Sequence, residues 1–187
     1  MKTKTQIWIY PLAFIGALLM LTSSCKKKTD NNNPAPTPKV IGQNYGGGII
    51  FYVDGTGQHG LIAAPYDQSS GALWGCNGTS ISGTSSAIGT GQANTTAIVK
   101  GCSTAGIAAR ICDDLGLNGY TDWFLPSADE LNLMFNQETV IGGFADNYYW
   151  SSSEYDANDV WNQHFNGGYQ NEFSKLSSYC VRAVRAF

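Results

Sequence analysis

A cluster of oxygen-bearing side chains near the C-terminus is the part of the sequence best suited to binding chemistry. Glu154, Asp156, Asn158 and Asp159 lie within six consecutive residues. Carboxylate and amide oxygens are the ligands that Ca²⁺ prefers in proteins. These four residues are therefore a candidate calcium site, and the alternative is an acidic turn that is simply solvated.

Aromatic residues flank this cluster and suggest a second kind of ligand. Aromatic faces can stack on sugar rings while neighbouring polar groups bond the sugar hydroxyls. The candidate ligand-binding residues are Trp150, Glu154, Tyr155, Trp161 and Asn162. The alternative is that the two tryptophans are core residues with no ligand.

Catalytic chemistry has little support in the sequence. His59 and His164 are the only two histidines, and thus the only side chains with an ordinary pKa suited to a general base near neutral pH. Neither belongs to a recognisable nucleophile motif, and Ser151–Ser153 lack the Gly-x-Ser-x-Gly pattern. We therefore predict no catalytic residues, no enzyme activity and no required cofactor, with Ca²⁺ as an optional ligand.

Three short strand-like runs follow one another at the end of the chain. They are Tyr148–Trp150, Val160–Phe165 and Tyr179–Phe187, and the last alternates with the two-residue period of a strand. Asn166, Gly167 and Gly168 follow the second run, and residues that accept positive φ favour a tight hairpin. The sequence predicts an antiparallel sheet that ends the domain.

Earlier segments predict a second hairpin and a long loop. Ile49–Val53 and Leu61–Ala64 flank the turn residues Asp54–Gly57. Ala72–Trp74 could form another short strand. Residues 75–96 are rich in Gly, Ser, Thr and Asn, so they read as a loop that is either functional or passive.

Two segments have helical patterns. Thr95–Leu115 carries an apolar stripe that Gly101 and Gly106 should divide into two short helices. Ser127 and Glu130 have the spacing of a capping box at the start of a further helix. Short helices together with small antiparallel sheets and long loops place the chain in the α+β class.

The N-terminus predicts export and lipid anchoring. Lysines precede an apolar run, residues 7–21, and small residues then precede Cys25. Residues 1–25 resemble a lipoprotein signal peptide whose cysteine is acylated; an ordinary cleaved signal or a short membrane anchor is the alternative. Residues 26–39 are rich in Lys, Asn and Pro and form a flexible tether. The folded domain is then residues 40–187.

Charge is distributed unevenly along the chain. From residue 40 onward there are five basic and 13 acidic residues, a formal charge of −8. Such a domain should repel nucleic acids and sulfated polysaccharides. Neutral glycans, peptides or cations are more compatible partners, and solubility alone could also explain the acidic surface.

Four motifs give the chain a family resemblance. YWSSSEYDANDVW, the Asn-Gly-Gly hairpin, VRAVRAF and GYTDWFLPSADEL are similar to the Lcl C-terminal domain family, over residues 46–187. That family takes its name from the C-terminal domain of a bacterial collagen-like adhesin linked to sulfated glycans. The ending also resembles the C-type-lectin-like fold. The resemblance implies a C-type-lectin-like α+β domain that binds ligands at a bacterial surface.

Apart from Cys25, the chain has Cys76, Cys102, Cys112 and Cys180. An even number in an exported domain favours disulfides, and four cysteines allow three pairings, with free thiols as the alternative. The C-type-lectin-like resemblance implies Cys112–Cys180 as the long disulfide, with Cys76–Cys102 as the second.

Together these features predict a lipid-anchored protein of the bacterial cell envelope, at the outer membrane and facing the exterior. Its expected partner is a glycan, an extracellular polymer or another surface protein, in adhesion. The membrane is contacted through the lipid anchor, and nucleic acid is not a partner. The alternative function is a structural or protein-interaction domain without a small ligand.

Overall fold

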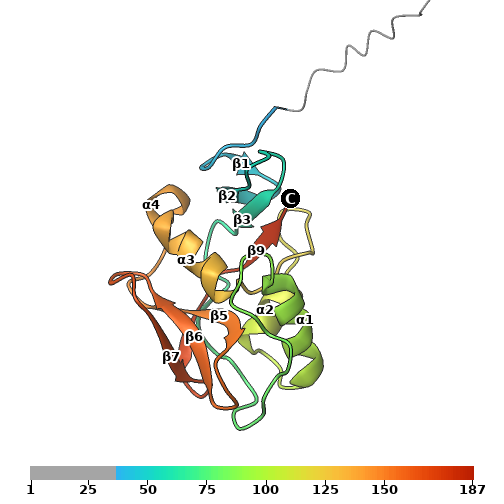
Figure 1. The fold of residues 1–187 in the computed structure, drawn as a ribbon, viewed down its shortest axis with the longest axis vertical. Coiled ribbons are helices and arrows are strands. Elements are labelled where there is room, and N and C mark those ends of the chain that lie inside the picture. The colour runs from blue at the N-terminus through green and yellow to red at the C-terminus, as the bar shows by residue number, and fades with distance from the viewer. Residues whose placement is uncertain (1–36) are drawn as a thin grey trace, which may run out of the picture. The chain divides into compact units, whose positions relative to one another are not determined.

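Short helices and two small sheets make up the part of the chain that the computed structural model describes, residues 37–187 (Figure 1). This arrangement is the α+β class that the sequence predicts. The predicted signal peptide, Cys25 and the tether up to residue 36 lie outside the described residues. Within residues 37–187, no helix combines the length and the apolar character needed to cross a membrane.

The first sheet is built on the hairpin predicted around Asp54. Strand β2 (Gly48–Val53) pairs antiparallel with β3 (Gly60–Ala63). Strand β1 (Asn44–Tyr45) lies outside β2, and β9 (Val184–Ala186) lies outside β3. The last strand of the chain therefore closes the sheet formed by the first three.

The second sheet holds the predicted C-terminal hairpin. Its order is β4-β8-β5-β6-β7, and its strands are β4 (Ser69–Leu73), β5 (Tyr148–Glu154), β6 (Asp159–His164), β7 (Gln170–Ser174) and β8 (Ser178–Val181). The Asn-Gly-Gly turn joins β6 to β7, as predicted. Strands β5 and β8 pair in parallel, whereas the sequence suggested antiparallel pairs throughout.

The closing run is not one strand, which corrects the prediction for Tyr179–Phe187. The run divides into β8 and β9, which belong to different sheets. Between them, the buried guanidinium of Arg182 donates to Asp67 (2.6 Å) and to the carbonyl of Gly143 (2.6 Å). The backbone N–H of Ala183 donates to the side chain of Gln68 (2.5 Å). These hydrogen bonds pair the polar groups of the segment that passes from β8 in the second sheet to β9 in the first.

The helices confirm the predicted split and the capping box. They are α1 (Gly91–Gly101), α2 (Ala108–Asp113), α3 (Ala128–Asn136) and α4 (Glu138–Ile141). Helix α1 begins four residues before the predicted Thr95, so the preceding loop is shorter than expected. At α3, the side chain of Ser127 accepts from the Glu130 N–H, and the Glu130 carboxylate accepts from the Ser127 N–H (2.8 Å).

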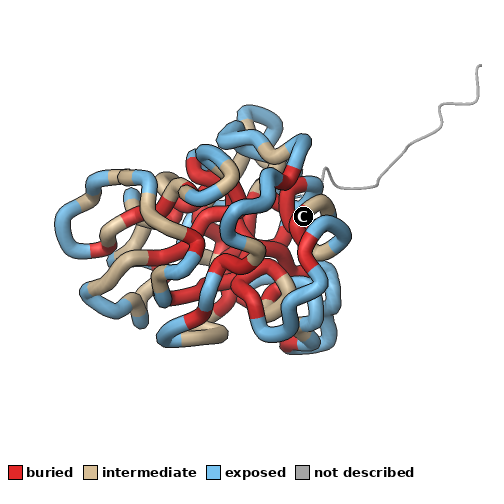
Figure 2. Tube along the Cα trace, turned by 90° about the horizontal axis from the view of Figure 1, so that it is seen from below, coloured by how far each residue is buried: buried red, intermediate tan, exposed pale blue. Residues whose placement is uncertain are grey.

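Two apolar clusters form the interior, where buried segments converge (Figure 2). The first joins helices α1 and α2 to the second sheet and includes Ile98, Ile107, Cys112, Trp150 and Val181. The second joins α3 to both sheets and includes Leu131, Met134, Tyr149, Phe165 and Cys180. Buried loop residues, among them Ile81 and Trp123 in the first cluster and Phe165 in the second, complete the interior.

The cysteines give one confirmed pairing and one correction. Cys76 and Cys102 form a disulfide, as predicted. Cys112 and Cys180 are both buried and free, so the Cys112–Cys180 pairing is wrong. The reason is that Cys112 on α2 belongs to the first apolar cluster and Cys180 on β8 to the second.

Candidate functional site

Trp150 is a core residue, which corrects its assignment as a ligand contact. Its side chain has no exposed surface. The indole N–H donates to the carbonyl of Ala72 (2.8 Å), and the ring packs against Tyr179 with centroids 4.8 Å apart. Trp150 therefore joins β4, β5 and β8 and cannot stack on a sugar.

Glu154 is a structural anchor, which corrects its assignment as a ligand contact and as a calcium ligand. Its carboxylate lies 2.5 Å from the Nζ atom of the fully buried Lys175. It also accepts from the N–H of Ile81 (2.9 Å) and the hydroxyl of Ser80 (2.9 Å). The charge and lone pairs of Glu154 thus hold the loop before α1 against the second sheet.

The remaining acidic residues form a self-contained turn. One carboxylate oxygen of Asp156 accepts from the N–H groups of Asn158 (2.7 Å) and Asp159 (2.9 Å). These backbone bonds lower the pKa of Asp156 below its ordinary value. Across residues 37–187, no three His, Cys, Asp or Glu side chains cluster as metal ligands. The geometry therefore gives the predicted calcium site of Glu154, Asp156, Asn158 and Asp159 no support.

Tyr155 and Trp161 do come together. Their rings meet edge to face with centroids 5.5 Å apart. Tyr155 is 55% exposed, and Trp161 is half-buried. Asn162 follows Trp161 on a strand, so its side chain points to the opposite face of the sheet. The structure thus separates the predicted pair of rings from the predicted amide.

A larger group of rings covers that opposite face. Its members come from β5, β6, β7, β8 and the turn before β7, and they are Tyr148, His164, Tyr169, Phe173 and Tyr179. We call these five residues the aromatic face. This face has no local signature in the sequence, because the rings are up to 31 positions apart (148 to 179) and meet only in the folded sheet.

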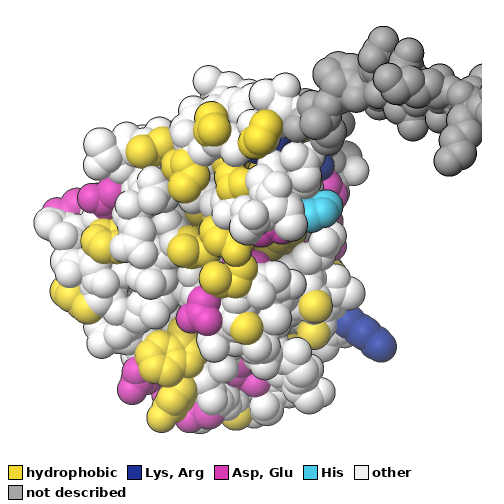
Figure 3. Space-filling view, turned by 45° about the horizontal axis from the view of Figure 1, so that its top comes forward, with side chains coloured by type: hydrophobic (Ala, Val, Ile, Leu, Met, Phe, Trp, Pro, Cys, Tyr) yellow, Lys and Arg dark blue, Asp and Glu magenta, His cyan; other side chains and the backbone are white. Residues whose placement is uncertain are grey.

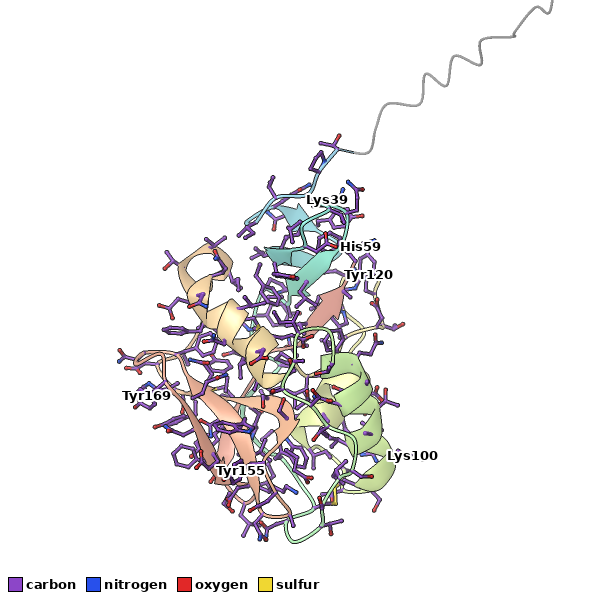
Figure 4. All side chains as sticks on the ribbon, in the orientation of Figure 1. Lys39, His59, Lys100, Tyr120, Tyr155 and Tyr169 are labelled. Carbon is purple, nitrogen blue, oxygen red and sulfur yellow. A yellow bond between two sulfur atoms is a disulfide. The ribbon has the colours of Figure 1, made fainter. Side chains whose placement is uncertain are left out.

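Tyr148 is the centre of the aromatic face. Its ring centroid lies 4.5 Å from His164, 5.0 Å from Phe173 and 5.1 Å from Tyr179. Its hydroxyl is 3.5 Å from that of Tyr169, which stacks on His164 with planes 2° apart. Tyr169 is 48% exposed and lies at the outer end of the sheet, away from Tyr155 (Figure 4). The other four rings are half-buried.

Asn162 lies beneath these rings. It pairs with Trp150 on β5 and with Asn171 on β7, so its side chain shares the face of Tyr148 and Phe173. It is fully buried, and neither its Oδ1 nor its Nδ2 atom has a hydrogen-bond partner. Of the residues predicted to bind a ligand, Asn162 is the one that lies in this site.

The basic side chains of the described residues are mostly used inside the protein. Three are buried in ion pairs: Lys175 with Glu154, Arg182 with Asp67, and Arg185 with Asp122. Arg110 donates to three backbone carbonyls. Acidic side chains are scattered over the face in Figure 3, where basic ones are few. Each of these ion pairs cancels one carboxylate, so the remaining charges still sum to the formal −8 of residues 40–187.

The sequence model of the Lcl C-terminal domain family matches residues 64–185, more than half of the chain. A solved structure of a fimbrial protein from Bacteroides ovatus ATCC 8483 is similar, with a TM-score of 0.52 and 15% identity. That alignment covers 73% of this chain and 43% of the other, and at this identity it shows fold alone. No curated protein matches the chain significantly.

Proposed function

Because the chain belongs to the Lcl C-terminal domain family, we propose that it is a non-catalytic binding domain at the bacterial surface. Its ligand is a neutral glycan or a similar extracellular polymer, bound during adhesion. The observation that carries this proposal is the aromatic face, five partly exposed rings on one side of a sheet. Clustered aromatic rings with hydroxyl and imidazole edges suit the mixed apolar and polar faces of sugars.

Electrostatics supports a neutral ligand over a sulfated one. Sulfated glycans are held by basic side chains, and here Lys175, Arg182 and Arg185 are buried in ion pairs. Residues 40–187 keep a formal charge of −8. A dense polyanion approaching this surface would be repelled, whereas a neutral sugar would not.

The proposal extends to the fold family and to the cell surface. We assign the domain, residues 40–187, to the C-type-lectin-like group, in keeping with its short helices and small sheets. The similar solved structure is described as a fimbrial protein, which is compatible with a role in adhesion. The proposed adhesin role follows from the family resemblance.

The proposed anchor is a lipid on Cys25. Residues 1–25 have the pattern of a lipoprotein signal, and residues 26–39 would hold the domain away from an outer membrane that faces the exterior. Replacing Cys25 with Ser should abolish lipid labelling and release the protein from the membrane fraction. Unchanged labelling of the Cys25→Ser variant would contradict this assignment.

Glycan-array binding by the full chain in detergent tests the function. We expect binding to neutral glycans and loss of at least about tenfold in affinity on Tyr169→Ala, because one stacking ring is removed. Tyr66→Ala is the matched control, since Tyr66 is 54% exposed but lies outside the aromatic face. If no glycan binds, the structural or protein-interaction alternative replaces the proposal.

A further inference from the structure

Asn162 carries a polar group that the folded protein leaves unsatisfied. Its side chain has no exposed surface, and its amide oxygen and nitrogen both lack hydrogen-bond partners. A buried amide without partners opposes folding, and most such groups in proteins are paired. Within residues 37–187, the donor and the acceptor of the Asn162 amide are thus both unused.

Strand register places this amide under the centre of the aromatic face. Tyr148 pairs with His164 and Phe173 pairs with Val160, so the line between the two rings crosses β6 at Asn162. The rings of Tyr148 and Phe173 are 5.0 Å apart and meet edge to face. The ring of Tyr179 lies 5.1 Å from that of Tyr148 and 5.7 Å from that of Phe173, so it borders the same part of the face. An aromatic ring is a weak hydrogen-bond partner.

Tyr169 lies at the exposed edge of the aromatic face. Tyr169 is 48% exposed, and its hydroxyl contact to Tyr148 is 3.5 Å long. Tyr169 also follows Gly168, whose φ of +72° belongs to the turn before β7. A ligand that reaches Asn162 would have to displace the rings of Tyr169 and Tyr148.

We infer that Asn162 is the specificity-determining residue of the aromatic face and that it hydrogen-bonds two hydroxyls of a neutral sugar. One sugar hydroxyl would donate to Oδ1, and a neighbouring hydroxyl would accept from Nδ2, because a primary amide presents both roles side by side. The rings of Tyr148 and Tyr169 would then flank the sugar. This inference rests on the proposed glycan function and adds the residue that selects the ligand.

Gln163 provides a matched control on the same strand. It is also fully buried and its amide also lacks partners. However, it pairs with Tyr149 of the second apolar cluster and with Gln170, whose side chain donates to the carbonyl of Ala128 at the start of α3. Gln163 therefore points into the protein, away from the aromatic face.

The test compares Asn162→Leu with Gln163→Leu in the full chain. Leucine resembles asparagine in shape and removes the unsatisfied amide, so the melting temperature of Asn162→Leu should be unchanged or higher. Its affinity for neutral oligosaccharides on a glycan array should fall at least tenfold. Gln163→Leu should keep wild-type affinity. If Asn162→Leu does not fold, Asn162→Ala takes its place, with the same expected loss of binding.

The outcomes separate this inference from the proposed function. If Tyr169→Ala loses binding and Asn162→Leu retains it, the role of Asn162 is wrong while glycan binding stands. If the wild-type chain binds no neutral glycan, both proposals fail. The side-chain amide signal of Asn162 is identified in the ¹⁵N spectrum of the wild type as the one that Asn162→Leu lacks. In the wild type, this signal should shift when the oligosaccharide is added. A signal that stays in place while the oligosaccharide binds would also overturn the inference.

Discussion

The Nζ atom of Lys175 lies 2.5 Å from Oε1 of Glu154, and this pair connects three separate segments of the domain. Lys175 also donates to the carbonyls of Thr79 and Ala157, each at 2.9 Å. The loop before α1, the acidic turn and the end of β7 thus meet at one buried ammonium. The pair also explains why Glu154 is not available to a metal ion.

Removing the cation alone should destabilise the domain strongly. Lys175→Met would leave the Glu154 carboxylate buried without its counter-ion, and breaking a buried pair in this way costs about 3–5 kcal/mol. The double variant Lys175→Met, Glu154→Gln should recover part of this loss, because no buried charge remains. Urea unfolding measures the free energy of unfolding of both variants. A Lys175→Met variant as stable as the wild type would contradict the structural role of the Lys175–Glu154 pair.

Local sequence signals predicted much of the fold. The Asp54 turn, the Asn-Gly-Gly hairpin and the Ser127–Glu130 capping box each depend on residues within a few positions of one another, and all three are present. The division between α1 and α2 follows from Gly101 and Gly106 in the same way. Such signals do not depend on distant contacts, so the sequence alone is sufficient for them.

Features that depend on distant contacts were not predicted. The separation of β8 from β9 follows from bonds of Arg182 to Asp67 and Gly143, which are far away in the sequence. The free thiols of Cys112 and Cys180 follow from their placement in different apolar clusters.

The candidate site also depends on residues that are far apart in the sequence. The sequence predicts Asn162 as a ligand contact because it lies near Trp150, Tyr155 and Trp161. Trp150 does pair with Asn162 across β5 and β6, but its ring is fully buried, and the partly exposed rings on the same face include Tyr148 and Phe173. Their alternation on short strands has no local signature that distinguishes a binding face from a core.

The two tryptophans named as ligand contacts should behave differently. Trp150→Ala removes a fully buried ring and should lower the free energy of unfolding by about 3–5 kcal/mol. Trp161→Ala removes a half-buried ring and should cost only about 1–2 kcal/mol. Thermal melts compare them, with Tyr155→Ala as the control for the exposed partner ring. Equal losses for both tryptophans would contradict the assigned burial.

Calcium should have no effect on the stability of the domain. Glu154 is paired with Lys175, and Asp156 accepts bonds from its own turn, so chelator should leave the melting temperature unchanged. Asp156→Ala should lower stability slightly through loss of those turn bonds. A rise in melting temperature with added Ca²⁺ that Asp156→Ala abolishes would restore the calcium site.

The contribution of Asp156 to stability should depend on pH. The folded-state pKa lies below the ordinary value of 3.8, so the unfolded chain binds the proton more readily. The stabilisation is therefore complete at pH values well above 3.8 and is lost as the pH falls through the folded pKa. The difference in melting temperature between wild type and Asp156→Ala should shrink in that acidic range.

The cysteines provide the last prediction, because two thiols and one disulfide should be distinguishable chemically. Burial raises the pKa of both Cys112 and Cys180, so little of either is in the reactive thiolate form near pH 8. Iodoacetamide should therefore label neither residue in the folded protein and both in denaturant. The rate of labelling should increase as the pH rises, because a larger fraction of each thiol becomes thiolate as the pH approaches its raised pKa.

Peptide mapping without reductant should then find Cys76 joined to Cys102. This disulfide closes a loop with a sequence separation of 26, so its reduction should cost about 3 kcal/mol in the chain-entropy description. Cys112→Ala should leave the Cys76–Cys102 peptide unchanged, because the two sites are chemically independent. A Cys112–Cys180 peptide, or rapid labelling of either thiol in the folded protein, would overturn the placement of these residues in separate apolar clusters.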